Sequence, residues 1–128
     1  TEIVLVKNKP YMFRFRARDV IHSAYMPEFR AQMNCVPGMS TVFPFTPIKT
    51  TAEAKAAKGN PNFEYYLYCN KICGAAHYNM KIKITVVGSD AEYNTWLAAQ
   101  AKTVAPPMEA APAAADSTAV TPAAVAAN

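Results

Sequence analysis

The chain has 128 residues, enough for one domain with a buried core and too few for two comfortable ones. It has no run of about 18 apolar residues that would span a bilayer, and it begins at Thr1 without an initiator methionine or a signal peptide. We therefore expect a soluble protein or a piece of a larger one. All 13 lysine and arginine residues, but only seven of the nine acidic residues, lie within residues 1–102, whose formal charge is +6. Because these cations are scattered along the chain, nucleic-acid binding is not expected.

The composition of the chain changes at residue 102. Residues 103–128 are dominated by alanine and proline, with almost no charge and almost no large side chains. Such a segment buries too little apolar surface to offset the entropy of ordering it. We interpret residues 1–102 as one domain and residues 103–128 as a flexible tail or linker.

An alternation of period two runs along residues 11–18 and predicts a strand. Aromatic or small side chains occupy one face of this strand, and methionine and arginine occupy the other: Tyr11, Phe13, Phe15 and Ala17 against Met12, Arg14, Arg16 and Arg18. We expect the strand to be half buried, with its aromatic face toward the core and its basic face toward solvent.

Turn and strand signals alternate further along the chain. Residues 36–39 are typical of a turn, and Pro44 and Pro47 confine their region to an edge strand or a loop. Residues 63–68 are rich in aromatic strand formers, and residues 82–86 alternate between apolar and polar side chains. Each of these two segments predicts a strand.

One helix is predicted, over residues 89–100. Ser89 and Glu92 have the spacing of a capping box, and we expect Trp96 and Leu97 to pack on the sheet. Several short strands separated by turns and closed by one helix favour an all-β fold. We predict a β-sandwich of about 100 residues with a short C-terminal helix.

Residues 69–80, CNKICGAAHYNM, place two thiols, an imidazole and a thioether close together. An amphipathic helix would gather these side chains on one face as ordinary core: Cys69, Cys73, His77 and Met80. However, the segment follows a predicted strand, contains Gly74 and runs directly into the strand at 82–86, so we expect a loop. Because Met80 has the parity of the apolar positions in that strand, its thioether is expected to point inward.

The chemistry of this loop has three interpretations. A redox disulfide between Cys69 and Cys73 would enclose three residues in an all-β context, whereas thioredoxin-type chemistry prefers two at the start of a helix. Zinc would take both cysteines and His77, but the thioether of Met80 is a poor zinc ligand. Thiolate, thioether and imidazole together favour copper.

A copper site on this loop calls for a histidine from an earlier strand, and His22 is the only other histidine in the chain. A mononuclear copper site does not need the second thiolate. Two thiolates four positions apart on one loop are able to bridge two metal ions. The additional cysteine therefore argues for two coppers.

Three segments, in order, resemble the copper domain of cytochrome c oxidase subunit II: DVIHS at 19–23, NCVPG at 34–38 and CNKICGAAHYNM at 69–80. The resemblance covers roughly residues 1–98. It implies a cupredoxin-like Greek-key sandwich that holds the binuclear CuA centre. It also implies the ligands: bridging Cys69 and Cys73, one histidine on each copper (His22 and His77), axial Met80 on one copper and the backbone carbonyl of Lys71 on the other.

The resemblance implies an electron carrier without turnover of its own. The domain would accept electrons from cytochrome c, or from a fused or neighbouring cytochrome domain, and pass them to haem in subunit I of a terminal oxidase. Members of the family are anchored by upstream membrane helices, so we expect the domain on the outer, periplasmic face of a bacterial inner membrane. No acid and base pair is visible, and no catalytic residue is assigned. The alternatives are the CuA domain of a nitrous oxide reductase and a mononuclear copper-binding or delivery module.

Two positions depart from the pattern of the family. The family usually has a glutamate where this chain has Lys71, and that carboxylate helps to hold a magnesium ion at the contact with subunit I. The carbonyl ligand does not depend on the side chain. Cys35 replaces a small family residue, and we expect a buried thiol rather than a ligand. The charge of +6 leaves the electron donor open, because like charges slow the encounter with a basic cytochrome.

Overall fold

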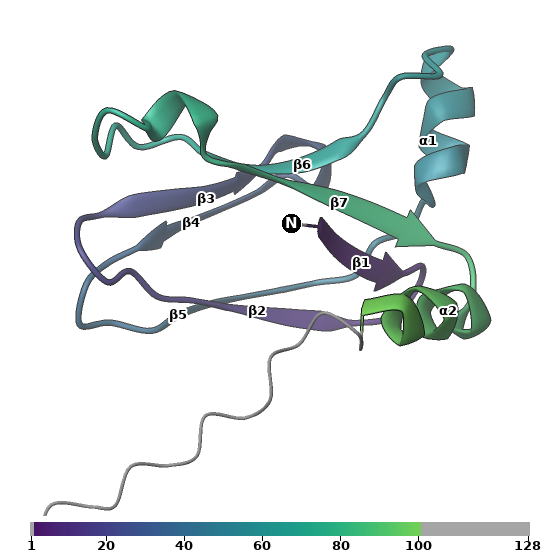
Figure 1. Cartoon of the computed structure of the whole chain (residues 1–128), viewed down its shortest axis with the longest axis horizontal. Coiled ribbons are helices and arrows are strands. Elements are labelled where there is room, and N and C mark those ends of the chain that lie inside the picture. Colours follow the sequence, from purple (N-terminus) through teal and green to yellow (C-terminus); the bar gives the residue numbers. More distant parts are fainter. Residues whose placement is uncertain (1, 101–128) are drawn as a thin grey trace, which may run out of the picture.

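The computed structural model describes residues 2–100, which form a sandwich of two β-sheets with two helices (Figure 1). The larger sheet has the strand order β1-β7-β6-β3-β4, and the smaller sheet pairs β2 with β5. The strands are β1 (Glu2–Val6), β2 (Tyr11–Phe15), β3 (His22–Met26), β4 (Ala31–Cys35), β5 (Thr41–Phe45), β6 (Tyr65–Cys69) and β7 (Lys81–Val87). The helices are α1 (Thr51–Lys58) and α2 (Asp90–Gln100), with short 3-10 turns η1 (Pro27–Phe29) and η2 (His77–Asn79). The predicted sandwich is confirmed, and the predicted tail at 103–128 lies outside the described residues.

The smaller sheet has the two contrasting faces that the sequence predicted. Burial alternates along β2, and Met12 and Arg14 are exposed between half-buried aromatic rings. β2 pairs antiparallel with β5, so that Met12 lies opposite Pro44. In a two-stranded sheet each strand is an edge, which is where a proline is tolerated. The edge strand predicted from the prolines is therefore confirmed.

The core fills the space between the two sheets. Ile84 of β7 and Met26 of β3 are fully buried, and they belong to one cluster with Leu5 and Tyr65. Aromatic rings of the smaller sheet pack against this cluster, among them Phe13. The aromatic face predicted for β2 thus meets the apolar face of the larger sheet, and this contact holds the sandwich together.

The chain contains a helix that the sequence did not predict. α1 begins after a complete capping box, in which the Thr50 hydroxyl accepts from the Glu53 amide at 3.0 Å and the Glu53 carboxylate accepts from the Thr50 amide at 2.9 Å. It ends at Gly59, which has a positive φ of 61°. The Thr51 hydroxyl accepts from the Val86 amide at 2.9 Å and so fixes the start of α1 to β7.

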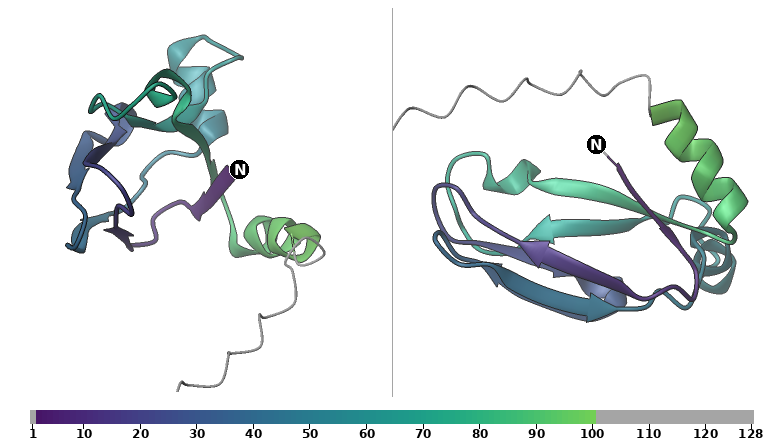
Figure 2. Two further views of the ribbon diagram at one scale, coloured as in Figure 1. Left: turned by 60° about the vertical axis from the view of Figure 1, so that its left-hand side comes forward. Right: turned by 90° about the horizontal axis from the view of Figure 1, so that it is seen from below.

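The predicted C-terminal helix forms as α2, but its packing differs from the expectation. Leu97 is 46% exposed, and no residue of α2 is buried. The predicted packing of Leu97 on the sheet is wrong, because α2 lies beside the sandwich, with its main contacts to β1 and β7 (Figure 2). Trp96 is half buried. Its ring is tilted against that of Tyr93, and the two ring centroids are 5.8 Å apart.

The two ends of the sandwich are built differently. At one end β3 begins, β6 ends and β7 begins, and residues 70–80 connect the last two strands. We call this the loop end. Both helices lie at the opposite end, which we call the helix end (Figures 1 and 2).

Candidate metal centre

Strand pairing brings His22 and Cys69 together at the loop end. His22 is the first residue of β3 and Cys69 is the last residue of β6. These strands are antiparallel neighbours, with Ala24 opposite Cys69. In such a pair the start of one strand lies beside the end of the other, so two residues that are 47 positions apart become neighbours.

Residues 70–80 form the predicted loop, which connects β6 to β7. The Cys69 amide donates to the Met80 carbonyl at 3.0 Å, and this hydrogen bond closes the loop at its base. Within the loop, the His77 amide donates to the Gly74 carbonyl at 3.1 Å, and the Met80 amide donates to the His77 carbonyl at 3.2 Å. Gly74 has a φ of 139°, a backbone conformation that residues with a Cβ rarely adopt. The loop is therefore held by hydrogen bonds of its own backbone.

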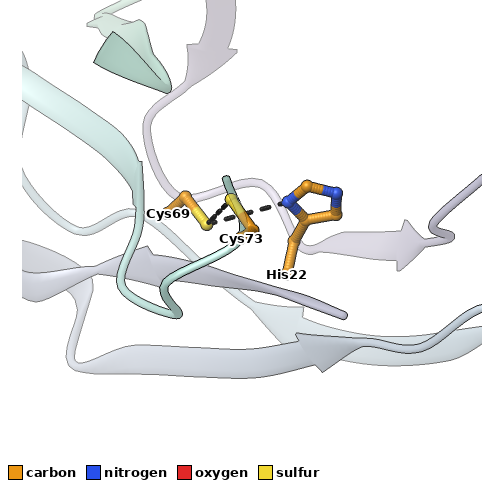
Figure 3. A group of neighbouring side chains, drawn as sticks. All are labelled: His22, Cys69 and Cys73. Carbon is orange, nitrogen blue, oxygen red and sulfur yellow. Dashed lines mark hydrogen bonds between the residues drawn. The ribbon is translucent and has the colours of Figure 1, made fainter. Parts of the chain in front are cut away.

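Two cysteine sulfurs form the middle of the cluster. The Sγ atoms of Cys69 and Cys73 are 3.6 Å apart, and both cysteines are free thiols (Figure 3). The ligand atoms of His22, Cys69 and Cys73 all lie within 4.8 Å of one another. Because three donors on two separate strands and a loop converge in this way, the site has the form of a metal centre.

Four further donor atoms surround the two sulfurs. Beside Cys69 Sγ lie the His22 Nδ1 at 3.9 Å and the Lys71 carbonyl oxygen at 3.3 Å. Beside Cys73 Sγ lie the His77 Nδ1 at 3.6 Å and the Met80 Sδ at 3.3 Å. The structure thus brings together all six groups that the sequence analysis named. Met80 reaches its place in another way than expected: it is 40% exposed and turns its sulfur toward Cys73, so the predicted inward orientation is wrong.

Asp19 orients the imidazole of His22. Its Oδ1 lies 2.9 Å from the Nε2 of His22, which leaves Nδ1 directed at Cys69. The hydrogen bond with Asp19 raises the pKa of His22, and the same contact lowers the pKa of Asp19. Asp19 belongs to the DVIHS segment at 19–23, but no role was predicted for it. Its position three residues before His22 was the available signal, because histidine ligands often bond a carboxylate through the second ring nitrogen.

The two thiols differ in acidity. Burial opposes ionisation of Cys69, but hydrogen bonds from the backbone of Ser23 and Lys71, and then from the two imidazoles, outweigh it and lower the pKa of Cys69 to about 6. Burial raises the pKa of the Cys73 thiol, and so do the hydrogen bond with Cys69 and the charge of its thiolate. One thiolate is therefore already present near neutral pH, and thiolate is the form that binds metal.

A cavity of about 930 Å³ adjoins the cluster, and its lining includes His22, Cys69 and Met80. Cys35 lines the same cavity but is only 8% exposed, and burial raises the pKa of its thiol. The sulfur of Cys35 makes its hydrogen bond with the Met33 carbonyl, at 3.9 Å. The expectation of a buried thiol at Cys35 is confirmed.

The fold and the donor cluster together define a cupredoxin-like metal-binding domain. The chain belongs to the family of cytochrome c oxidase subunit II: the family model described as "Cytochrome C oxidase subunit II, periplasmic domain" matches residues 1–87. The resemblance inferred from the three sequence segments is therefore confirmed, and the family is that of the oxidase rather than of nitrous oxide reductase.

Several known proteins resemble this chain. The alternative cytochrome c oxidase subunit 2 of Bradyrhizobium diazoefficiens is 40% identical over 92 residues, which are 72% of this chain and 28% of that protein. The crystal structure of the periplasmic domain of subunit II of cytochrome oxidase of Bradyrhizobium japonicum matches with a TM-score of 0.67 and 28% identity, over 82% of this chain and 67% of that one. A mixed disulfide between a thioredoxin-like protein and such a periplasmic domain matches with a TM-score of 0.61 and 28% identity, over 82% and 65% of the two chains.

The chain spans about 28% of the length of the curated relative from Bradyrhizobium diazoefficiens. Among residues 2–100, no helix has the length and apolar character that crossing a membrane requires. The family description assigns the matched segment to the periplasmic part of subunit II.

Proposed function

We propose that this chain is the copper-binding, electron-transferring domain of a haem–copper oxidase, with two copper ions bridged by Cys69 and Cys73. One observation carries the proposal: two sulfurs 3.6 Å apart are surrounded by two imidazoles and two weak donors, which is one set of donors for each of two ions. A single ion would use one such set and leave the other without a role. The arrangement supports one imidazole, from His22 or His77, and one weak donor, the Lys71 carbonyl or the Met80 thioether, on each copper.

The donor types support copper over zinc. Thiolate, thioether and imidazole are soft or intermediate ligands, and a thioether is not a usual zinc ligand. Bound copper would supply one-electron redox chemistry. The protein's part is to keep the donors in place, and it does so through the pairing of β3 with β6 and the hydrogen bonds at the base of the loop. Rigid donors reduce the rearrangement that accompanies each change of oxidation state.

The partners follow from the family. Relatives are named as subunits of cytochrome c oxidase and of haem–copper oxidases. We propose that this domain accepts electrons from cytochrome c or a cytochrome domain and passes them to haem in subunit I, on the periplasmic face of the membrane. The described cluster offers metal ligands and no substrate-binding acid and base pair, so the domain acts as a carrier within an oxidoreductase complex.

The relative that forms a mixed disulfide with a thioredoxin-like protein suggests how the thiols are kept ready for metal. We propose that the pair of Cys69 and Cys73 must be reduced before copper enters, because the metal binds thiolates and not a disulfide. Lys71 adds its carbonyl to the cluster, whereas its side chain is exposed. An ammonium group is no metal ligand, so we propose no magnesium site at this position.

The test is the copper count per chain together with the electron paramagnetic resonance spectrum of the copper-loaded protein. We expect two coppers that share one unpaired electron, seen as hyperfine splitting from two equivalent nuclei. Cys73→Ser should abolish this signal, while Cys35→Ala, the matched change in the third cysteine, should retain it. One copper per chain with the splitting of a single nucleus would contradict the proposal and indicate a mononuclear or delivery site.

A further inference from the structure

Ion pairs gather toward the helix end and the middle of the sandwich. Each of five lysines has an acidic partner: Lys7 with Glu53 at 2.6 Å, Lys9 with Asp90, Lys55 with Glu64 and Lys58 with Glu28 at 2.9 Å, and Lys83 with Glu2 and Glu64 at 3.6 Å. These pairs neutralise the surface locally. Two exposed cations beside α1, Arg30 and Lys49, form no ion pair among residues 2–100.

The loop end has cations without such partners. Within residues 2–100, no ion pair is formed by any of five exposed cations, which we call the basic rim: Arg14, Arg16, Arg18, Lys71 and Lys81. The arginines and Lys81 line the same cavity as His22 and Cys69, and Lys71 belongs to the metal loop itself. The one acidic residue in this cavity, Asp19, is engaged with His22. Of the seven cations among residues 2–100 that form no ion pair, five therefore belong to the basic rim, and the other two are Arg30 and Lys49.

Exposed apolar side chains adjoin the same cluster. Ile72 is 86% exposed and Tyr78 is 88% exposed, and each is a sequence neighbour of a donor residue, Cys73 and His77. Ile21, which precedes His22, is also exposed. We call Ile21, Ile72 and Tyr78 the apolar patch. An apolar centre bordered by polar residues is the usual anatomy of a protein interface.

We propose that the loop end docks an acidic redox protein, whose anionic surface meets the basic rim and whose apolar contact area covers the apolar patch. That the partner is a redox protein rests on the proposed function, whereas its acidity rests on the unpaired cations. Rim charges of one sign speed the encounter with a partner of the opposite sign and slow it with a like-charged partner. A basic cytochrome is therefore disfavoured as the donor.

An anionic membrane surface is the competing occupant for a set of cations. The observations favour a protein, because Ile72 and Tyr78 of the apolar patch lie on the metal loop and electron transfer needs close contact at that loop. A lipid surface would not need its contacts centred on the donors. The two occupants are separated by the experiment below.

The first measurement is a binding titration of the metal-free full chain, labelled with ¹⁵N and followed by NMR at low salt. One probe is cytochrome c with succinylated lysines, which has an acidic surface, and the other is the unmodified basic protein. With the acidic probe we expect amide shifts within residues 14–22 and 70–81, which disappear at about 0.5 M salt. With the basic probe we expect none.

A pair of charge-matched variants locates the surface. Arg14→Gln combined with Arg16→Gln should raise the Kd for the acidic probe by about tenfold. Arg30→Gln combined with Lys49→Gln removes the same charge beside α1, where these two residues line a different cavity, and should change the Kd by less than about twofold. Equal effects of both pairs would mean attraction by net charge alone and would overturn the proposal.

Two further outcomes are decisive. Shifts that appear with vesicles containing phosphatidylglycerol, but not with the acidic cytochrome, would overturn the proposal in favour of a membrane surface. A two-copper spectrum without binding of the acidic probe would overturn the docking surface alone. Binding at the basic rim by a protein that never yields the two-copper spectrum would uphold the surface and reject the proposed function.

Discussion

The helix end and the loop end of the same sandwich treat polar groups in opposite ways. At the helix end, lysines are paired with acids and the first turn of α1 is capped by Thr50 and Glu53. At the loop end, the donor atoms face one another and the basic rim has no ion pairs among the described residues. Large apolar side chains are also exposed there. Stability and binding are therefore assigned to separate ends of the sandwich. One end satisfies its own groups, and the other keeps them available for a metal and a partner.

The strands connect these two tasks. β7 begins beside Met80 at the loop end, and it continues to Ile84 and Val86, which are buried in the core. β6 ends at Cys69 and begins at the buried Tyr65. Burial along each strand holds its loop-end residue in place, although the loop end itself contributes little apolar burial. The comparison therefore predicts which changes affect folding and which affect metal binding.

The largest effect is expected from Ile84→Ala. Ile84 is fully buried, and removing its side chain leaves a cavity, so the free energy of unfolding should fall by about 3 kcal/mol. The measurement is urea unfolding of the metal-free protein. Val42→Ala, at an exposed position of β5, is the control and should change stability by less than about 0.5 kcal/mol. The copper count of the folded Ile84→Ala protein should remain two, and a lower count would mean that the two ends are not separable.

Asp19→Asn should lower copper affinity by about 10- to 100-fold with little effect on folding. The carboxylate that orients His22 becomes an amide, which bonds the imidazole more weakly and allows the ring to turn. The measurement is competition for copper against a chelator of known affinity. Asp90→Asn is the matched control, because it makes the same change in an ion pair at the helix end. Equal affinities of the two variants would show that Asp19 does not position His22.

The thiol of Cys69 should ionise near pH 6 in the metal-free protein, because its hydrogen bonds outweigh burial and lower its pKa to about 6. A lowered pKa means that the thiolate is present above this pH and is lost as the pH falls through it. At pH 7 we expect Cys73→Ser protein to react with iodoacetamide about two- to threefold faster than an ordinary thiol, because the larger thiolate fraction is partly offset by the lower nucleophilicity of an acidic thiol. Mass spectrometry of the modified site, from pH 4.5 to 9, provides the rate. Cys35, whose pKa is raised by burial, is the internal control, and a midpoint above pH 8 at Cys69 would contradict the assignment.

Most of the candidate site could be predicted from the sequence, because its chemistry is concentrated in one loop. Cys69, Cys73, His77 and Met80 lie within one short segment, and only His22 had to come from elsewhere. With two histidines in the chain, that choice was unambiguous. The role of Asp19 required the orientation of a ring, which spacing alone does not give. The basic rim could not be predicted, because it depends on which cations form ion pairs in the fold. Lys7, for example, pairs with Glu53, which is 46 positions away in the sequence.

The fold was predictable where periodicity is strong and not where it is weak. β2 alternates clearly, and its faces were predicted correctly. α1 has only Thr51 and Ala54 buried, so it shows no apolar stripe, although a capping box and Gly59 mark both of its ends. The prediction that Leu97 packs on the sheet was wrong, because a helix that contains apolar residues need not lie on the core. Local end signals were more informative for α1 than periodicity.

The smallest effect, and the sharpest test of the separation, is expected from Thr50→Ala. The change removes the hydroxyl that accepts from the Glu53 amide, and the loss of such a cap costs about 1 kcal/mol. Urea unfolding measures this loss. Ser89→Ala removes the corresponding cap of α2, where the Ser89 hydroxyl accepts from the Glu92 amide at 3.3 Å. Because α2 buries no residue, it can fray without unfolding the sandwich, and this variant should cost less than Thr50→Ala. Neither change should alter copper binding, since both lie at the helix end, and a loss of copper in Thr50→Ala would show that α1 supports the cluster through β7.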